Sequence, residues 1–415
     1  MSRPEHQIGN SQLISAVNSR LVLQAIRALQ PTYRAEVARH TRLTPATVTG
    51  IVNGLLDHDL LTATPEYGAT TPRGGRPPQI LNVNAGARYV LAVDLEPDVL
   101  RVALTDLLVN IIEFREQAVD RFAEPDGTCR TLLRLCTEVL GEASTTKLLG
   151  AGLSLPGVVD TTEGILISST NMPRWHNVPI RALLEQRLSL PVKVGRSTHL
   201  AALHEEWIRP LEPDRIVLLI SLRTGIGMCL MTHGEVYVGG LGFDGEIGHT
   251  VVEIDGSPCE CGNRGCLETF VSASAVCERA EAMMRLRRGR ALRACLDQGE
   301  ILRPELVYRL AKRGDADCAE IVRDVGRYIG IAAANMINLF APHEVVLCGS
   351  IDTADEIILD VVKRQVEAHS LPKSRERLTI RLAEAKEKAP LLGAAVLVAQ
   401  EIFELPKLTY AASHA

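Results

Sequence analysis

Apolar residues near the start of the chain recur at the spacing of one helix face. A first stripe runs from Leu21 to Leu29, and a shorter one lies between Arg34 and His40. A third helix has the clearest start signal in the chain, because Thr44 can cap it and Pro45 suits its first position. The pattern therefore predicts three short helices in the first part of the chain.

The third predicted helix keeps small residues on the side away from its apolar stripe. A helix that enters the major groove of DNA needs such a face, because bulky side chains would hold it away from the bases. The turn before it, Thr41 to Leu43, has the length of a helix-turn-helix connection. A docking or dimerisation module is the alternative interpretation. The small residues are Ala46, Thr47, Thr49 and Gly50.

Two alternating runs, 60–64 and 79–83, predict a two-stranded ribbon after these helices. The loop between them carries arginines on a glycine turn, which can reach a phosphate or enter a narrow minor groove. These features predict a winged helix-turn-helix, in which Thr47 and Thr49 contact bases and the arginines contact phosphates. The candidate DNA-binding residues are Arg34, Pro45, Ala46, Thr47, Thr49, Arg73, Gly74, Gly75 and Arg76.

The longer part of the chain alternates between runs typical of strands and runs typical of helices. In the first part of this region, strands are followed by a helix at 127–142 and then by another strand, and this order occurs twice. The repetition predicts two related α/β lobes with a cleft between them. We expect an actin-like, ribonuclease-H-like fold, with the helix from Leu391 to Phe403 packing back on the first lobe. The strand-like runs lie at 89–95, 99–105, 109–116, 149–155, 215–222, 228–232, 235–239 and 344–347.

Composition is that of an aliphatic globular chain, with 46% hydrophobic and 4% aromatic residues. No apolar run of about 18 residues and no export signal is visible, so we expect a cytoplasmic protein without a membrane span.

Residues 1–84 hold eight arginines and five acidic residues, whereas the whole chain carries a net charge of −5. A basic first segment on an acidic body is weak support for contact with an anion.

Three of the ten cysteines are crowded together. Cys259, Cys261 and Cys266 follow His249, and three thiols with one imidazole make a full tetrahedral set for Zn²⁺. Because no ligand position stays open for water, the predicted zinc is structural and not catalytic. Glycines between the thiols supply the tight turns. The other seven cysteines stand singly in apolar surroundings and are predicted to be reduced core thiols.

Six motifs of the body follow one another in a set order. They are GLSLPGVVD (152–160), NMPRWHNVPI (171–180), GEIGH (245–249), CECGNRGCLE (259–268), LFAPHEVVLCGS (339–350) and LLGAA (391–395). In this order they resemble the ROK family, named for repressors, open reading frames and kinases, over nearly the whole chain. A helix-turn-helix ahead of the body resembles the transcriptional-regulator branch, with the xylose and N-acetylglucosamine repressors, and not the kinases.

The resemblance implies a sugar-kinase-like body in which the zinc ligands lie beside a sugar site. Carboxylates and amides read vicinal hydroxyls because each offers two hydrogen bonds in one plane. One imidazole nitrogen of His249 would hold the metal while the other meets the sugar. The implied sugar-facing residues are Asn171, Glu246, His249 and Glu268.

Two departures from the kinase pattern predict that catalysis is lost. Arg196 and Ser197 stand where the kinases carry an asparagine and the aspartate that acts as general base, and a serine hydroxyl cannot replace that base. The turn after the first strand of the body reads Glu96, Pro97, Asp98 where glycines would approach phosphate, so ATP should be repelled.

The change at Arg196 also alters the expected effector. It brings a cation to one edge of the sugar site, next to Ser197. We therefore expect a sugar phosphate or sugar acid held partly by Arg196, as an alternative to a neutral sugar, or else the loss of sugar sensing.

The leading hypothesis is a zinc-containing regulator, expected to be a repressor, of carbohydrate-related genes. It would bind double-stranded operator DNA as a homodimer or homotetramer and would have no catalytic residues. One alternative is a sugar kinase with a regulatory DNA-binding head, and another is a constitutive DNA binder with a vestigial cleft. The expected domains are a winged helix-turn-helix at 1–84, a first lobe at 85–195 completed by the helix 390–405, and a second lobe at 196–389 with the zinc knuckle and oligomerisation helices.

Overall fold

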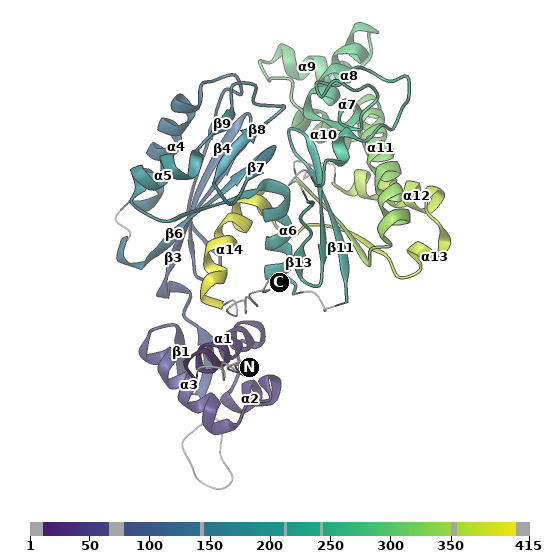
Figure 1. Ribbon diagram of the computed structural model, residues 1–415. Helices are drawn as coiled ribbons and strands as arrows, with labels where there is room; N and C mark the ends of the chain where they lie inside the picture. The colour runs from purple at the N-terminus through teal and green to yellow at the C-terminus, as the bar shows by residue number, and fades with distance from the viewer. Residues whose placement is uncertain are drawn as a thin grey trace, which may run out of the picture.

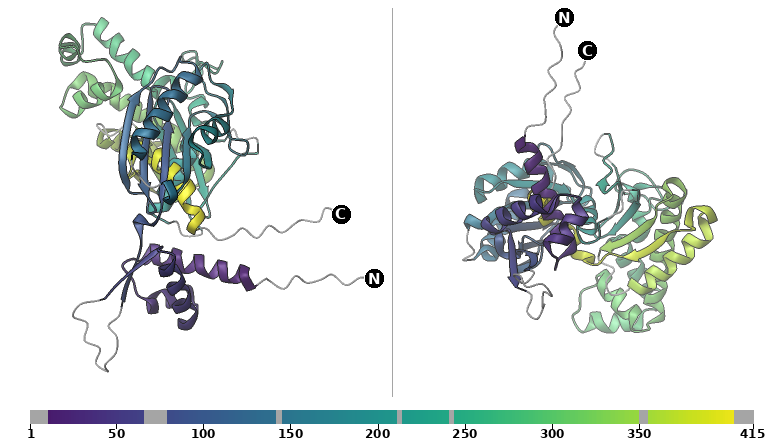
Figure 2. Two further views of the ribbon diagram at one scale, coloured as in Figure 1. Left: turned by 90° about the vertical axis from the view of Figure 1, so that its left-hand side faces the viewer. Right: turned by 90° about the horizontal axis from the view of Figure 1, so that it is seen from below.

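The computed structural model describes residues 11–65, 79–141, 145–210, 214–240, 244–349 and 355–403. Figure 1 shows a small head, in purple, beneath a body of two lobes that are built on separate sheets. The view turned by 90° in Figure 2 shows the same separation of head and body.

The head contains three helices and a two-stranded antiparallel sheet. α3 starts where the sequence predicts, because Thr44 Oγ1 accepts a hydrogen bond from the backbone N–H of Thr47 at 3.2 Å. Its apolar stripe, with Val48 and Val52 fully buried, packs against α1 and α2. The elements are α1 (Ser11–Leu29), α2 (Arg34–Thr41), α3 (Pro45–Asp57), β1 (Leu61–Pro65) and β2 (Gln79–Val83).

A five-stranded sheet forms the centre of the first lobe, in the order β10-β6-β3-β4-β5. The strands β3, β4 and β5 make an antiparallel meander, while β6 and β10 run parallel to β3. Helices α4 and α5 cover one face, and α14 covers the other. The bounds are β3 (Tyr89–Leu95), β4 (Val99–Asp106), β5 (Ile111–Ala118), β6 (Leu148–Leu155), β10 (Val192–Arg196), α4 (Pro125–Leu140), α5 (Ile180–Leu188) and α14 (Ala389–Phe403).

The second lobe repeats this plan with the sheet order β13-β12-β11-β14-β15. The long helix α11 packs against α10 and α12 and buries Val325 and Ile329 completely. The bounds are β11 (Ile216–Leu222), β12 (Ile226–Thr232), β13 (Glu235–Val236), β14 (Glu344–Gly349), β15 (Thr379–Leu382), α8 (Ala273–Arg285), α9 (Arg290–Asp297), α10 (Pro304–Lys312), α11 (Ala316–Phe340), α12 (Asp355–His369) and α13 (Pro372–Arg375).

One helix, α6 (Ser197–Ile208), lies between the lobes. It packs on α14 and β10 of the first lobe and also on β11 and β12 of the second. Its N-terminal end is at the cleft, and its C-terminal end reaches the head, where Trp207 meets Arg27 of α1.

Most of the predicted elements are confirmed, including the return of α14 to the first lobe. The sequence did not indicate the small sheet of β7 (Val158–Asp160), β8 (Ile165–Ser168) and β9 (His176–Val178), whose strands are very short. The first helix begins at Ser11, earlier than the stripe from Leu21 to Leu29 that predicted it. Within the described ranges, every helix is too short or too polar to cross a membrane.

Candidate functional site

The four predicted zinc ligands come together in a knuckle of the second lobe. Their ligand atoms all lie within 4.8 Å of one another. His249 turns its Nδ1 toward the thiols, 3.7 Å from Cys259 Sγ, and Cys261 Sγ lies 3.7 Å from Cys266 Sγ. Gly265 between them has φ +66°, and a Cβ there would lie 1.6 Å from the carbonyl oxygen of Glu253. The donor set and its spacing therefore suit a closed tetrahedral metal site.

The remaining seven cysteines are isolated from this cluster. Five of them are buried, as predicted for core thiols, but Cys277 and Cys295 are partly exposed on the helical side of the second lobe. Burial raises the pKa of the Cys136 thiol to about 12, so it stays protonated near neutral pH.

A small cavity opens beside the knuckle, between the two lobes. About 100 Å³ is open to the centres of water molecules, which at roughly 10–15 Å³ per water is room for several waters or one sugar ring. The lining includes every predicted sugar-facing residue, namely Asn171, Arg196, Ser197, Glu246, His249 and Glu268.

Short turns from both lobes bring these side chains into the cavity. Glu246 precedes the helical turn Ile247–His249, and Glu268 opens the short helix α7 (Glu268–Val271). Gly225 lets the two lobes approach here, because a Cβ at that position would lie 2.7 Å from Glu268 Oε2 and 3.2 Å from Asn171 Nδ2.

Arg196 does not offer an unpaired charge to the cavity. Its guanidinium contacts Glu246 Oε1 at 2.6 Å and Asp244 Oδ1 at 3.3 Å, and only 8% of its side chain is exposed. His199 Nε2 holds the other oxygen of Asp244 at 2.7 Å. Burial works against ionisation of Asp244, but the contacts with His199, the backbone hydrogen bond from Gly239 and the charge of Arg196 together outweigh it and lower the pKa of Asp244 to about 2. The expectation that Arg196 is an available cation is therefore not met.

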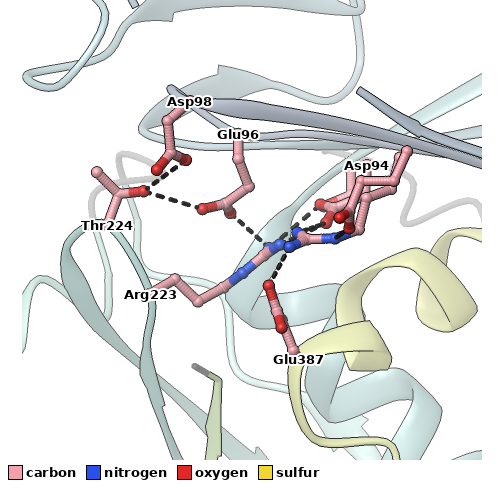
Figure 3. A network of polar contacts seen from close by, with 9 residues as sticks. Asp94, Glu96, Asp98, Arg223, Thr224 and Glu387 are labelled. Carbon is pink, nitrogen blue, oxygen red and sulfur yellow. Dashed lines mark hydrogen bonds and ion pairs between the residues drawn. The ribbon is translucent and has the colours of Figure 1, made fainter. Parts of the chain in front are cut away.

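The turn that follows the first strand of the body takes part in a buried network between the lobes, shown in Figure 3. Arg223, at the end of β11, pairs with Asp94 and with Glu96 Oε1, the latter at 2.5 Å. The hydroxyl of Thr224 contacts Glu96 Oε2 at 3.3 Å and Asp98 Oδ1 at 3.4 Å. Burial raises the pKa of Glu96 to about 7, although the charge of Arg223 opposes that shift.

The head presents the predicted face of α3 to solvent. Pro45, Ala46 and Thr49 are exposed and Thr47 is partly exposed. Arg34 lies at the edge of this face, with its guanidinium near Gln79 Oε1 at 3.0 Å and Asn53 Oδ1 at 3.3 Å. The predicted wing residues Arg73, Gly74, Gly75 and Arg76 lie outside the described residues.

Sequence reasoning did not find Asp244 or His199 as parts of the cleft, and it placed Arg223 in a phosphate-side turn without its acidic partners. Asp244 pairs with Arg196, and His199 lies two residues after Ser197. Neither Asp244 nor His199 belongs to one of the six motifs. Arg223 did carry a signal, because it is a bulky cation at the start of the glycine-containing turn 223–227. Its partner Asp94 lies 129 residues away, a separation that a sequence pattern does not bridge.

The fold and the cleft define a two-lobed protein of the sugar-kinase type with a small helical head. Residues 90–401 match the model of the ROK family, and the chain belongs to that family. It is 26% identical to the xylose repressor of Caldicellulosiruptor bescii, over 96% of this chain and 100% of that protein.

Two solved structures extend the comparison. A ROK family transcriptional regulator, described as a homologue of the Escherichia coli MLC protein, has a TM-score of 0.75 at 26% identity and covers 94% of this chain and 97% of its own. A ROK family glucokinase from Streptomyces griseus, with glucose and AMPPNP, has a TM-score of 0.65 at 24% identity and covers 75% of this chain and 99% of its own. The glucokinase therefore shares its fold with about three quarters of this chain, and the remaining quarter has no counterpart in it.

Proposed function

We propose that the protein is a DNA-binding transcriptional repressor of carbohydrate-related genes. The similarity to a xylose repressor spans that protein completely, head included, and a ROK family regulator shares the fold over nearly the whole chain. The proposed domains are the winged helix-turn-helix head at 1–84, the first lobe at 85–195 with the helix 390–405, and the second lobe at 196–389.

The observation that carries DNA binding is the outward face of α3. Gly50 lies in the middle of this helix, where glycine costs about 0.5–1 kcal/mol relative to alanine. A Cβ at Gly50 would meet nothing within 4 Å, so packing inside the protein does not require a small residue there. A small residue on that face is explained when an external partner, such as the floor of a DNA groove, approaches it closely.

Gly50→Leu tests this assignment. The added side chain points into open space and leucine favours helix, so the thermal midpoint should stay equal or rise. Entry into the groove would be blocked, so specific affinity for DNA should fall at least tenfold. DNA selected with the wild-type protein from a random library, then measured by anisotropy at a stated salt concentration, provides the assay.

The matched control is Gly127→Leu in the first turn of α4, a partly exposed position where a Cβ meets only the tip of Arg130 at 3.9 Å. It should leave DNA affinity unchanged. Equal affinity of the Gly50 variant and the wild type would reject the proposed recognition helix, and failure of the wild type to select any DNA would reject DNA binding itself.

We propose that His249, Cys259, Cys261 and Cys266 bind a structural Zn²⁺. Three thiolates and one imidazole saturate a tetrahedral ion, so the metal would fix the knuckle and supply no reactive water. With Nδ1 of His249 on the thiol side, Nε2 is left to face the neighbouring cavity. The metal would thereby set the tautomer and aim of an effector-binding ring.

For the effector we propose a neutral sugar or an amino sugar, in preference to a sugar phosphate or sugar acid. Both guanidinium groups of the described cavity lining are paired with carboxylates, Arg196 with two and Arg223 with two. Glu268 adds a further acid beside Asn171. An anionic ligand would meet this surplus of carboxylates, whereas hydroxyl groups would find acceptors of the kind they need.

Calorimetry separates these ligand classes. D-xylose, D-glucose and D-glucosamine should include a binder, and glucose 6-phosphate and glucuronate should not bind measurably. Binding of either anion with loss on changing Arg196 to methionine would restore the acidic-sugar alternative. If none of the compounds binds and none releases the protein from its selected DNA, constitutive DNA binding with a vestigial cleft becomes the better account.

We propose that the body has no kinase activity. Ser197 stands where the resemblance places the general base of the family's kinases, and Arg223 fills the phosphate side of the cleft. A coupled ADP-release assay over the same sugars should show no turnover above background. Turnover that Glu246→Gln abolishes would establish the kinase alternative.

The repressor is proposed to act in the cytoplasm as a homodimer or homotetramer on a symmetric operator.

A further inference from the structure

We propose that Arg223 replaces a nucleotide as the element that joins the two lobes at the phosphate side of the cleft. The chain then carries its own link between the lobes at the phosphate side of the cleft, and the cleft closes without ATP. Arg223, Asp94 and Glu96 form this link, which we call the clasp. The inference goes beyond the proposed repressor function, because it holds whether or not the head binds DNA.

The clasp joins residues of both lobes directly. Arg223 follows β11 in the second lobe, while Asp94 and Glu96 stand at the end of β3 in the first lobe. Arg223 Nη1 lies 3.2 Å from one Asp94 oxygen, Nη2 contacts the other oxygen, and Glu96 Oε1 is 2.5 Å away. All three side chains are at most 6% exposed, so water screens these contacts little.

A second arginine, Arg101, links the clasp to the segment through which the chain returns to the first lobe. Arg101 of β4 lies 3.5 Å from Asp94 and pairs with Glu116 of β5 and with Glu387. Glu387 belongs to the helical turn Lys386–Lys388, which connects β15 of the second lobe with α14 of the first. Figure 3 shows Arg223 pointing from the second lobe into this group of acids. The network therefore spans both lobes and the connecting segment between them.

The position of the clasp is the one that a nucleotide would need. Backbone N–H groups of glycine turns bind phosphate in such clefts, and the turn 223–227 still contains Gly225 and Gly227. A phosphate chain here would have to pull Arg223 from two carboxylates and would then lie against Asp94, Glu96 and Asp98. Like charges in a buried site disfavour that exchange strongly.

The clasp also makes separation of the lobes costly. Rotating the lobes apart would separate Arg223 from its partners. Removing only the cation would leave two buried carboxylates facing each other, which destabilises a protein more than removing the whole ion group. A buried ion pair within one lobe would show the same asymmetry in stability, so the clasp is distinguished from it by a change in how the two lobes are held together.

The experiment compares three forms of the full-length protein in small-angle X-ray scattering and hydrogen exchange. Arg223→Met should enlarge the radius of gyration, speed exchange at 94–98 and 223–227 at least tenfold, and lower the thermal midpoint. The neutral triple variant Asp94→Asn, Glu96→Gln, Arg223→Met should regain the midpoint yet keep the larger radius and the faster exchange. This form keeps the test valid if the single variant fails to fold.

Arg288→Met is the matched control, because Arg288 pairs with Asp317 and Glu320 on the surface of the second lobe alone. It should change none of the three readouts. A wild-type radius and wild-type exchange in both Arg223 variants would overturn the clasp. Calorimetric binding of magnesium ATP to the wild-type protein would overturn it as well, since the phosphate side of the cleft would then be open.

Discussion

At the scale of single residues, His204 is a buried base in the middle of α6. Burial lowers its pKa from 6.5 to about 4, and only 5% of the residue is exposed. The unfolded chain therefore binds a proton between pH 6.5 and 4 that the folded protein does not, and the free energy of unfolding falls as the pH drops through this window. Two and a half pKa units correspond to about 3 kcal/mol.

His204→Gln should remove this acid sensitivity. Urea unfolding at pH 7.5 and pH 4.5 measures it: the variant should gain up to about 3 kcal/mol relative to the wild type between the two values. The exposed His58→Gln serves as the control and should run parallel to the wild type. Parallel behaviour of the His204 variant would mean that the histidine is already hydrated or charged in the fold.

Residue chemistry that lies within one segment was well predicted from the sequence. The knuckle is an example, because its four ligands span His249 to Cys266 and their types alone suit zinc. The sequence did not predict that acidic side chains pair with Arg196 and Arg223, since those partners lie in other segments of the chain. A cation in a sequence shows its charge, whereas only the fold shows which acid already pairs with it.

At the scale of elements, α6 joins the cleft to the head. Its twelve residues span about 18 Å, from Ser197 in the cavity lining to Trp207 beneath Arg27 of α1. The Arg27 guanidinium lies 3.8 Å from the centre of the indole ring and donates to the Trp207 carbonyl oxygen at 2.9 Å. Phe403 of α14 meets the same ring edge-on, with the ring centres 5.3 Å apart.

Arg27→Leu should loosen the head from the body, because it removes a cation–π contact and a hydrogen bond worth about 1–2 kcal/mol together. Hydrogen exchange of residues 21–29 should then accelerate roughly tenfold, since about 1.4 kcal/mol corresponds to that factor. Arg20→Leu, on the same helix, should have little effect. Unchanged exchange in the Arg27 variant would show that apolar packing alone holds the head in place.

Elements with strong periodicity or clear caps were predicted to within a few residues, as α3 and β3 illustrate. The short strands β7 to β9 were not predicted, because three or four residues carry too little pattern. The role of α6 was also beyond the sequence, since a helix packed on both sheets shows no single apolar stripe. What fixes such elements is contact with distant parts of the chain.

At the scale of the whole molecule, the proposed zinc couples local geometry to stability. Binding of a structural metal is part of the folding free energy, because the unfolded chain has no preformed site. Stripping the metal with a chelator should lower the thermal midpoint and the sugar-dependent change in DNA affinity together. Metal analysis of Cys266→Ser should show loss of zinc, and Cys277→Ser, outside the knuckle, should retain it. A metal-free protein with the original midpoint and regulation would contradict the structural role.

The position of α14 bears on how the protein is made. This helix is among the last described segments of the chain, yet Leu391 and Ala395 lie in the same core as Val22 of the head and Ala92 of the first sheet. Gly152 of β6 approaches it so closely that a Cβ there would lie 1.8 Å from the Ala394 carbonyl oxygen. During synthesis, the head leaves the ribosome first and can fold early, but the first lobe has to wait for residues 389–403. A stop codon shortly before α14 would therefore release a chain in which one face of the first-lobe sheet is never covered.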